Sequence, residues 1–121
     1  MKVTVNDKTK VFISTLFQSR DKAHLAHLKS KNYAEHIALG SYYEGILDLT
    51  DTFVESYQGL VGVIDISIPE SKNNEGMLVH LKGLCELCDT VKTQFPDWLS
   101  NQIQEMQKLI YQTIYKLENL K

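Results

Sequence analysis

The sequence predicts an all-α fold, a four-helix bundle, on three observations. Apolar residues recur at three- and four-residue spacing over four separate stretches, which is typical of amphipathic helices. Only two prolines and six glycines interrupt the 121 residues. The link between the second and third stretches is longer than the others, so we expect it to cross over along the bundle. A chain of this length forms one domain, residues 1–121.

The first helix is expected from about Asp7, a favourable N-cap residue, to about Lys29. His27 and His24 lie on two adjacent apolar stripes of this helix, so both imidazoles are expected on or beside its apolar face. The two stripes are Phe12, Leu16, Ala23 and His27, and Ile13, Phe17, His24 and Leu28. Residues 30–32 predict a tight turn, which makes the first two helices antiparallel neighbours.

The second helix, Tyr33 to Gly62, contains no proline and would form about eight turns at ~3.6 residues per turn. Its expected core-facing sector is apolar: Leu39, Tyr43, Ile46, Thr50, Phe53, Val54, Tyr57, Leu60 and Val61. A narrower sector beside it holds His36, Gly40, Leu47, Asp51, Glu55, Gln58 and Gly62. Because imidazole, carboxylates and glycines are an unusual mixture for a solvated face, we expect a contact here between two copies of the helix, with a metal site inside it.

The third and fourth helices follow a connection over residues 65–74 that is broken at Pro69. The third is expected from about Glu75 to Lys92, and its inward residues are Leu78, Leu81, Leu84, Cys85, Cys88 and Val91. The pair Phe95-Pro96 marks the start of the fourth, since proline suits a first helical turn. Its inward residues are Leu99, Ile103, Met106, Leu109, Ile110, Ile114 and Leu117.

Composition excludes several classes of protein. The 43% apolar and 23% charged residues are typical of a globular domain, and no apolar run reaches the ~18 residues of a membrane span. The first ten residues lack a signal-peptide core, so we expect a cytoplasmic protein. A net charge of −2 provides no basic field for nucleic acid, and Lys2, Lys8 and Lys10 are too few to make DNA more than a weakly supported partner.

Histidine and carboxylate side chains are ligands for iron, zinc and manganese. Along one continuous helix, His36 lies roughly 22 Å from Asp51 and roughly 28 Å from Glu55 at ~1.5 Å per residue, so one chain cannot bring them to one ion. In an antiparallel pair of second helices with the twofold axis near Glu44-Gly45, His36 lies between Asp51 and Glu55 of the other copy. His27 and His24 reach the same end through the tight turn. The simpler interpretation is that the carboxylates are solvated and the histidines structural.

The segment His27–Gly62 resembles the core of the Dps-type mini-ferritins, which have a ferritin-like bundle with a longer crossover connection between the second and third helices. The resemblance implies a ferroxidase site across a dimer interface, with ligands at His27, His36, Asp51 and Glu55, and His24 as an alternative to His27. It also implies a homodimer through the second helix and a dodecameric cage. The run HLKSKNYAEHIALG, residues 27–40, is similar to short, phage-encoded members of this group.

Two departures from the family pattern limit what the resemblance implies. Gly40 stands where the family usually has an acidic residue, and Leu28 stands where a tryptophan usually follows the first histidine. The expected function is therefore binding of iron, or of zinc or manganese, at an inter-subunit site, with Fe(II) oxidation for iron sequestration as a further step. The alternative is a phage-encoded ferritin-like structural or interaction protein without ferroxidase activity.

Cys85 and Cys88 lie on one helical face, with His80 about a turn and a half before them. A zinc site usually needs two such cysteine pairs, and the chain has one. Because both thiols also fit the apolar stripe of the third helix, we expect them to be reduced and buried in the core.

Overall fold

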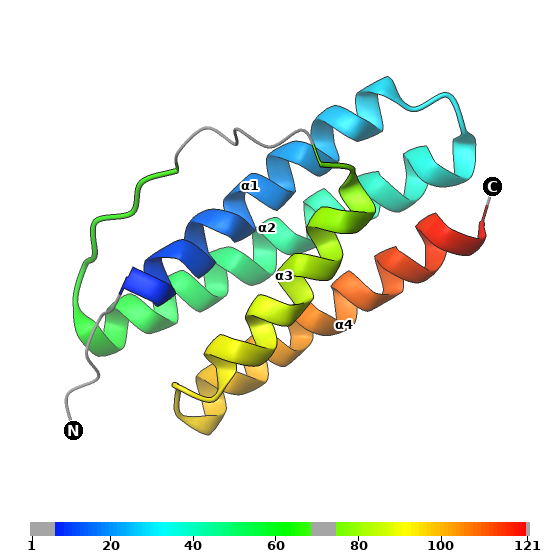
Figure 1. Ribbon diagram of the computed structural model, residues 1–121. Helices are drawn as coiled ribbons and strands as arrows, with labels where there is room; N and C mark the ends of the chain where they lie inside the picture. Colours follow the sequence, from blue (N-terminus) through cyan, green and yellow to red (C-terminus); the bar gives the residue numbers. More distant parts are fainter. Residues whose placement is uncertain (1–6, 69–74, 121) are drawn as a thin grey trace.

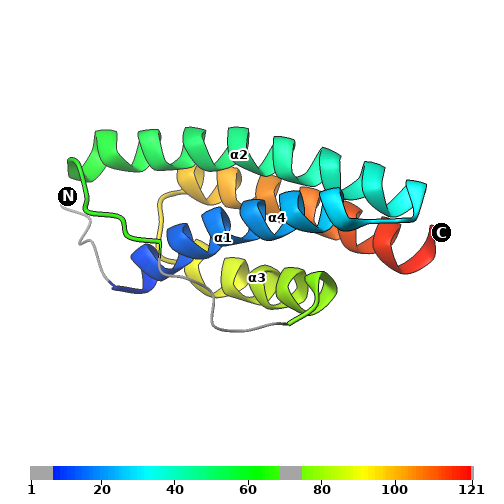
Figure 2. The ribbon, with the colours of Figure 1, turned by 90° about the horizontal axis from the view of Figure 1, so that it is seen from above.

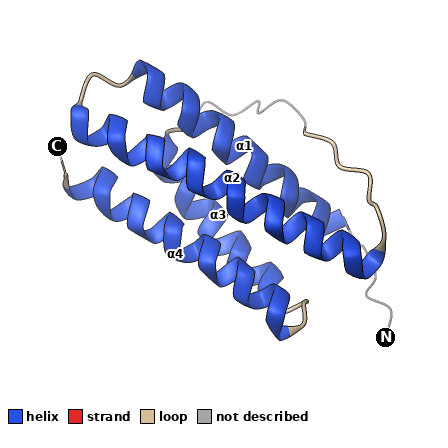
Figure 3. Cartoon of the chain, turned by 180° about the vertical axis from the view of Figure 1, so that it is seen from behind, coloured by secondary structure: helices blue, strands red, loops and turns tan. Residues whose placement is uncertain are grey.

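The computed structural model describes residues 7–68 and 75–120, and the regular secondary structure within these ranges is entirely helical (Figures 1 and 3). Its elements are α1 (Asp7–Lys29), α2 (Tyr33–Val61), α3 (Met77–Lys92) and α4 (Asp97–Asn119). The all-α prediction is confirmed, and each expected helix boundary agrees with the structure to within two residues. The break expected at Pro69 lies outside the described residues, and so does Lys2.

Each helix packs against two others, so that the four surround a common core (Figure 2). α1 packs against α2 and α3, and α4 packs against the same two helices from the opposite side. The pairs α1–α4 and α2–α3 therefore lie across the diagonals of the bundle. This arrangement leaves α2 with one long face that no other described helix covers.

The core is apolar and fully enclosed at its centre, where Phe12, Leu16, Ile46, Phe53 and Ile103 are 0% exposed. The predicted inward residues of α3 and α4 are confirmed: Leu81, Leu84, Cys85, Cys88, Val91, Leu99, Ile103, Met106, Ile110 and Ile114 are buried. Leu78, Leu109 and Leu117 pack against this core from partly buried positions.

Most of the expected core-facing sector of α2 is confirmed, and the differences lie at Tyr42, Tyr43 and Leu60. The expected residues that are buried are Leu39, Ile46, Thr50, Phe53, Val54 and Tyr57. Tyr42 is 0% exposed, and its hydroxyl lies 2.8 Å from the Ser19 Oγ of α1, so the buried phenol has a partner. Leu60, expected in the core, is 40% exposed, and Leu28 of α1 is 66% exposed. Leu60 lies on the same side of α2 as Tyr42, so its exposure reflects its position at the end of the helix. Near the middle of α2, Gly45 lets Leu109 of α4 approach closely.

The helix ends follow from local sequence. Asn32 caps α2, since its side chain accepts a hydrogen bond from the Glu35 backbone N–H at 3.1 Å. Gly62 ends α2 with a φ of 92°, a conformation that favours glycine. Among the described residues, no helix combines the length and apolarity needed to cross a membrane.

Candidate metal centre

The structure pairs His27, in the last turn of α1, with His36, in the first turns of α2. Their rings are stacked, with centroids 3.7 Å apart and planes inclined by 18°. His27 Nδ1 lies 2.6 Å from the His36 carbonyl oxygen, and His36 Nδ1 lies 2.7 Å from the His27 carbonyl oxygen. The tight turn predicted over residues 30–32 therefore brings these two histidines together, as the sequence indicated.

These reciprocal hydrogen bonds determine which nitrogen of each ring carries a proton. A carbonyl oxygen only accepts hydrogen bonds, so each Nδ1 must carry the proton and donate it. In the neutral imidazole, Nε2 then keeps its lone pair, which is the form that binds a metal ion. Because the two rings are nearly parallel, their in-plane lone pairs do not converge on a common point, and one ring would have to turn for both to bind one ion.

Gly40 makes room for this pair within one chain. A Cβ atom at residue 40 would lie 3.0 Å from His27 Cε1 and 3.1 Å from His27 Nδ1. The contact between two copies of α2 that was expected around Gly40 stays a prediction. Within one chain, the missing side chain at Gly40 lets the His27 ring approach the α2 backbone.

His24 lies beside the pair without joining it. Its ring stacks on Tyr43 of α2 at 4.2 Å, and it is 6.5 Å from the ring of His27. Tyr43 also meets His27 edge to face at 5.4 Å. Tyr43 was expected in the core, but it is half-buried and its ring contacts the rings of His24 and His27. Its spacing of seven residues from His36, two helical turns, was the signal that places both on one side of α2.

Asp51 and Glu55 are exposed on the uncovered face of α2 and lie away from the histidines. None of the ion pairs within the described ranges involves either carboxylate, and α2 contains no lysine or arginine. Because α2 is continuous, the chain does not bring these residues to His36. Within residues 7–68 and 75–120, no three histidine, cysteine or acidic side chains are placed to hold a metal ion together.

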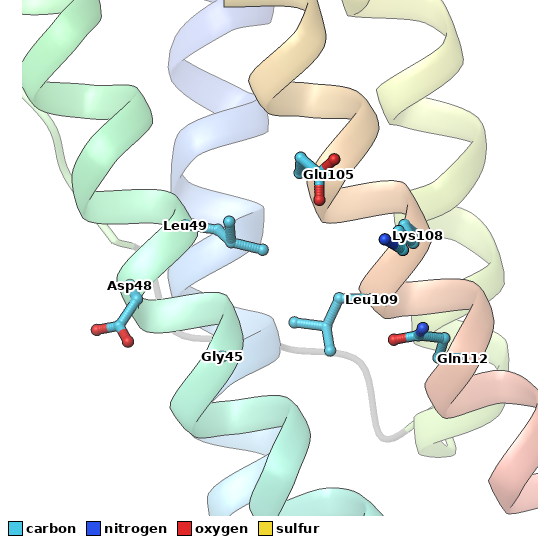
Figure 4. A pocket seen from close by; sticks show the side chains of 7 residues that line it. All are labelled: Gly45, Asp48, Leu49, Glu105, Lys108, Leu109 and Gln112. Carbon is cyan, nitrogen blue, oxygen red and sulfur yellow. The ribbon is translucent and has the colours of Figure 1, made fainter.

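A shallow groove of about 410 Å³ runs between α2 and α4 near the middle of the bundle (Figure 4). Leu49 and Leu109 point into it, while the Asp48 carboxylate points away from it on the far side of α2 (Figure 4). Gly45 faces Leu109 of the same chain, and the twofold axis expected near Glu44-Gly45 stays a prediction.

The expectation that the cysteines are free and buried is confirmed, since Cys85 and Cys88 are unpaired and 4% and 0% exposed. Burial raises the pKa of the Cys88 thiol to about 12 and also raises that of Cys85. Burial therefore favours the protonated thiol at both residues. His80 forms no metal-binding group with them among the described residues, and its Nδ1 is hydrogen-bonded to Glu75.

The comparison with protein families matches residues 27–117, about three quarters of the chain, to a family of unknown function, DUF5856. The chain belongs to this family. The DUF5856 region contains α2, α3 and most of α4, together with His27, His36, Asp51 and Glu55. His24 and most of α1 precede it. No curated protein and no solved structure matches the chain significantly.

Proposed function

We propose that this DUF5856 protein is a ferritin-like, Dps-type bundle that binds iron, or zinc or manganese, at a site shared by two copies. His27 and His36 supply the imidazoles from one copy, and Asp51 and Glu55 supply the carboxylates from the other. The observation that carries the proposal is the reciprocal pairing of the two histidines. Metal-binding histidines commonly donate one ring N–H to a carbonyl group, which orients the other nitrogen toward the ion.

A second copy is needed because of the length of α2. The helix is unbroken from Tyr33 to Val61, so His36 and Asp51 remain roughly 22 Å apart within one chain. An antiparallel copy of α2 on the uncovered face would bring each histidine pair to the other copy's carboxylates, and a twofold axis creates two equal sites. Support for this face comes from Leu28, Tyr33 and Ile37, which are 66%, 80% and 47% exposed around the histidine pair.

A ferritin-like topology requires the second and third helices to run parallel, with a crossover between them. The support for this part of the proposal is the placement of the helix ends in Figures 1 and 2. α2 ends beside the beginning of α1, whereas α3 begins toward the opposite end of the bundle (Figures 1 and 2). The dodecameric cage, the cytoplasmic location and the phage-encoded origin remain predictions from the resemblance.

If the site is active, Fe(II) is its substrate, and each iron loses one electron to oxygen or peroxide. A carboxylate at residue 40 is missing, and the His27 ring occupies its space. We therefore propose binding of one metal ion per site as the primary activity. The second candidate is a ferritin-like structural or interaction protein without ferroxidase activity, and the parallel, stacked histidine rings favour it because they are not yet arranged as a chelate.

Mixing two variants tests the shared site. His36→Ala should abolish tight Zn(II) or Fe(II) binding, because both sites of the dimer lose a histidine ligand. The double variant Asp51→Asn, Glu55→Gln should do the same, because both sites lose their carboxylate ligands. A mixed dimer has one interface with histidines from the carboxylate variant and carboxylates from the histidine variant. Calorimetry should then recover up to one site per mixed dimer. No recovery in verified mixed dimers would rule out a shared site.

A matched control distinguishes the loss of metal ligands from the loss of negative charge alone. The double variant Glu86→Gln, Glu105→Gln removes the same charge at exposed residues of α3 and α4, away from the proposed contact, and should keep metal binding. Titration of Fe(II) with oxygen or peroxide, followed by ferric absorbance, then distinguishes a ferroxidase from the structural alternative. Metal binding without oxidation would favour a binding site alone, and no metal binding would favour the structural protein.

Assembly is tested separately at Ile37, which is 47% exposed on the proposed contact face. Ile37→Asp should shift the sedimentation of the protein from dimer toward monomer, because it buries a carboxylate in an apolar contact. Val79→Asp, at a 61% exposed residue of α3, is the matched control and should leave association unchanged. A wild-type chain that stays monomeric at high concentration would defeat the proposed dimer.

A further inference from the structure

His80 is a buried histidine that the proposed metal site does not use. It lies in the first turns of α3 and is only 6% exposed. Its Nδ1 lies 3.1 Å from Glu75 Oε1, just before the helix. Its Nε2 is buried and has no hydrogen-bond partner among the described residues.

This environment favours the neutral ring. A carboxylate accepts hydrogen bonds, so Nδ1 carries the proton and Nε2 keeps a lone pair. Protonation would bury a positive charge and create an N–H donor with no acceptor, both of which are costly. Burial accordingly lowers the pKa of His80, Glu75 opposes that shift, and Lys22 of α1 adds to it. Within the described residues, Glu75 and Lys22 are the charged groups that act on this ring.

The Glu75–His80 pair lies at a weakly capped helix end. Gly76 is the N-cap of α3, and no side chain caps the helix there. The first turn of α3 also has no acidic residue to offset the helix dipole. The link from Glu75 to His80 therefore ties the start of the helix to a residue one turn further along.

The same first turn forms one wall of a cavity at the histidine end of the bundle. The cavity has a volume of about 360 Å³, and Gly76, Met77 and Leu78 form the α3 side of it. The other walls come from the remaining helices: Ala26, Glu35, Leu39 and Leu117. Any movement of the first turn of α3 thus changes access to apolar surface between the four helices.

We propose that the buried His80 ring is an acid-sensitive latch, which keeps the first turn of α3 packed while the ring is neutral and lets this turn and the end cavity open when the ring is protonated. The proposal stands independently of the metal site. His80 is neutral in the closed state and binds its proton more readily once the turn has opened. The ordinary pKa of histidine is about 6.5, so the closed state is stable above this pH and becomes less stable as the pH falls below it.

Hydrogen exchange across pH tests this latch. Exchange of the α3 segment, corrected for the intrinsic effect of pH, should show protection that falls by up to about tenfold per pH unit below about 6.5, because one proton is bound on opening. Protection of α4 in the same sample should change much less, since the opening is local. In His80→Phe, which keeps a buried ring that cannot be protonated, the fall in α3 should disappear.

Three outcomes would overturn the latch. They are protection of α3 that does not depend on pH, an undiminished fall in His80→Phe, and an equal fall in α4 that reports opening of the whole bundle. If circular dichroism shows that His80→Phe does not fold, His80→Gln serves instead, because its amide also cannot be protonated. Loss of the pH dependence in that variant supports the latch, and its persistence overturns it.

Discussion

The two ends of the bundle each gather four aromatic rings, and they differ in chemistry and burial. At the α3–α4 turn, Phe12, Phe53, Tyr57 and Phe95 meet with ring centroids 5.6–6.0 Å apart, mostly edge to face. These rings are at most 9% exposed. At the α1–α2 turn, the rings are His24, His27, His36 and Tyr43, and all four are half-buried.

This difference separates stabilisation from binding. Buried benzene-type rings stabilise through removal from water and through close packing, and they leave no ligand atom available. The imidazoles at the other end use hydrogen bonds to backbone carbonyls to fix their orientation, and they keep part of each ring accessible. We therefore expect substitutions at the first end to change the free energy of unfolding most, and substitutions at the second to change binding most.

The largest expected effect is at Phe53, which contacts three other rings and is 0% exposed. Phe53→Ala should lower the free energy of unfolding by about 3–5 kcal/mol, because it removes apolar contact and leaves a cavity. His24→Ala, at the other end, should cost no more than about 1.5 kcal/mol, roughly the value of one aromatic pair. Urea unfolding measures both losses. Equal losses would contradict the claim that the aromatic cluster at the α3–α4 turn stabilises the fold more than the histidine end.

An intermediate effect is expected at Asn32, which caps α2 beside the histidine pair. Asn32→Ala should lower the free energy of unfolding by about 1 kcal/mol, because the Glu35 N–H loses its acceptor. Asn32→Asp is the control, since aspartate caps about as well. If both variants lose the same stability in urea unfolding, the cap is not what holds this end of α2.

The smallest effect compares two helical glycines. Gly83→Ala in α3 meets nothing within 4 Å and should raise the free energy of unfolding by about 0.5–1 kcal/mol through helix propensity. Gly40→Ala should gain less or lose stability, because its Cβ pushes on the His27 ring. NMR should show shifted His27 signals only in Gly40→Ala. Equal gains at both residues would mean that the His27 ring has free space to move.

Sequence alone determined the helices and their ends. Apolar spacing placed all four, and the turn at residues 30–32 and Pro96 marked where two of them begin, because helix periodicity and turn formation depend on neighbouring residues. The short turn after Lys29 was also enough to predict that His27 and His36 lie at one end. The shared metal site with Asp51 and Glu55 stays a prediction, since a contact between copies is not part of a single chain.

Only the tertiary structure decided which edge of α2 faces the core and what each small or polar residue does there. Periodicity correctly placed Leu39, Ile46 and Phe53 in the core, but at the edge of that sector only the neighbouring helices decide that Tyr42 is buried and Tyr43 half-buried. The stacking of His27 on His36 and the role of Gly40 depend on how closely α1 approaches α2. The Glu75–His80 contact needed the start of α3 and its burial against the bundle, which spacing along one helix does not specify.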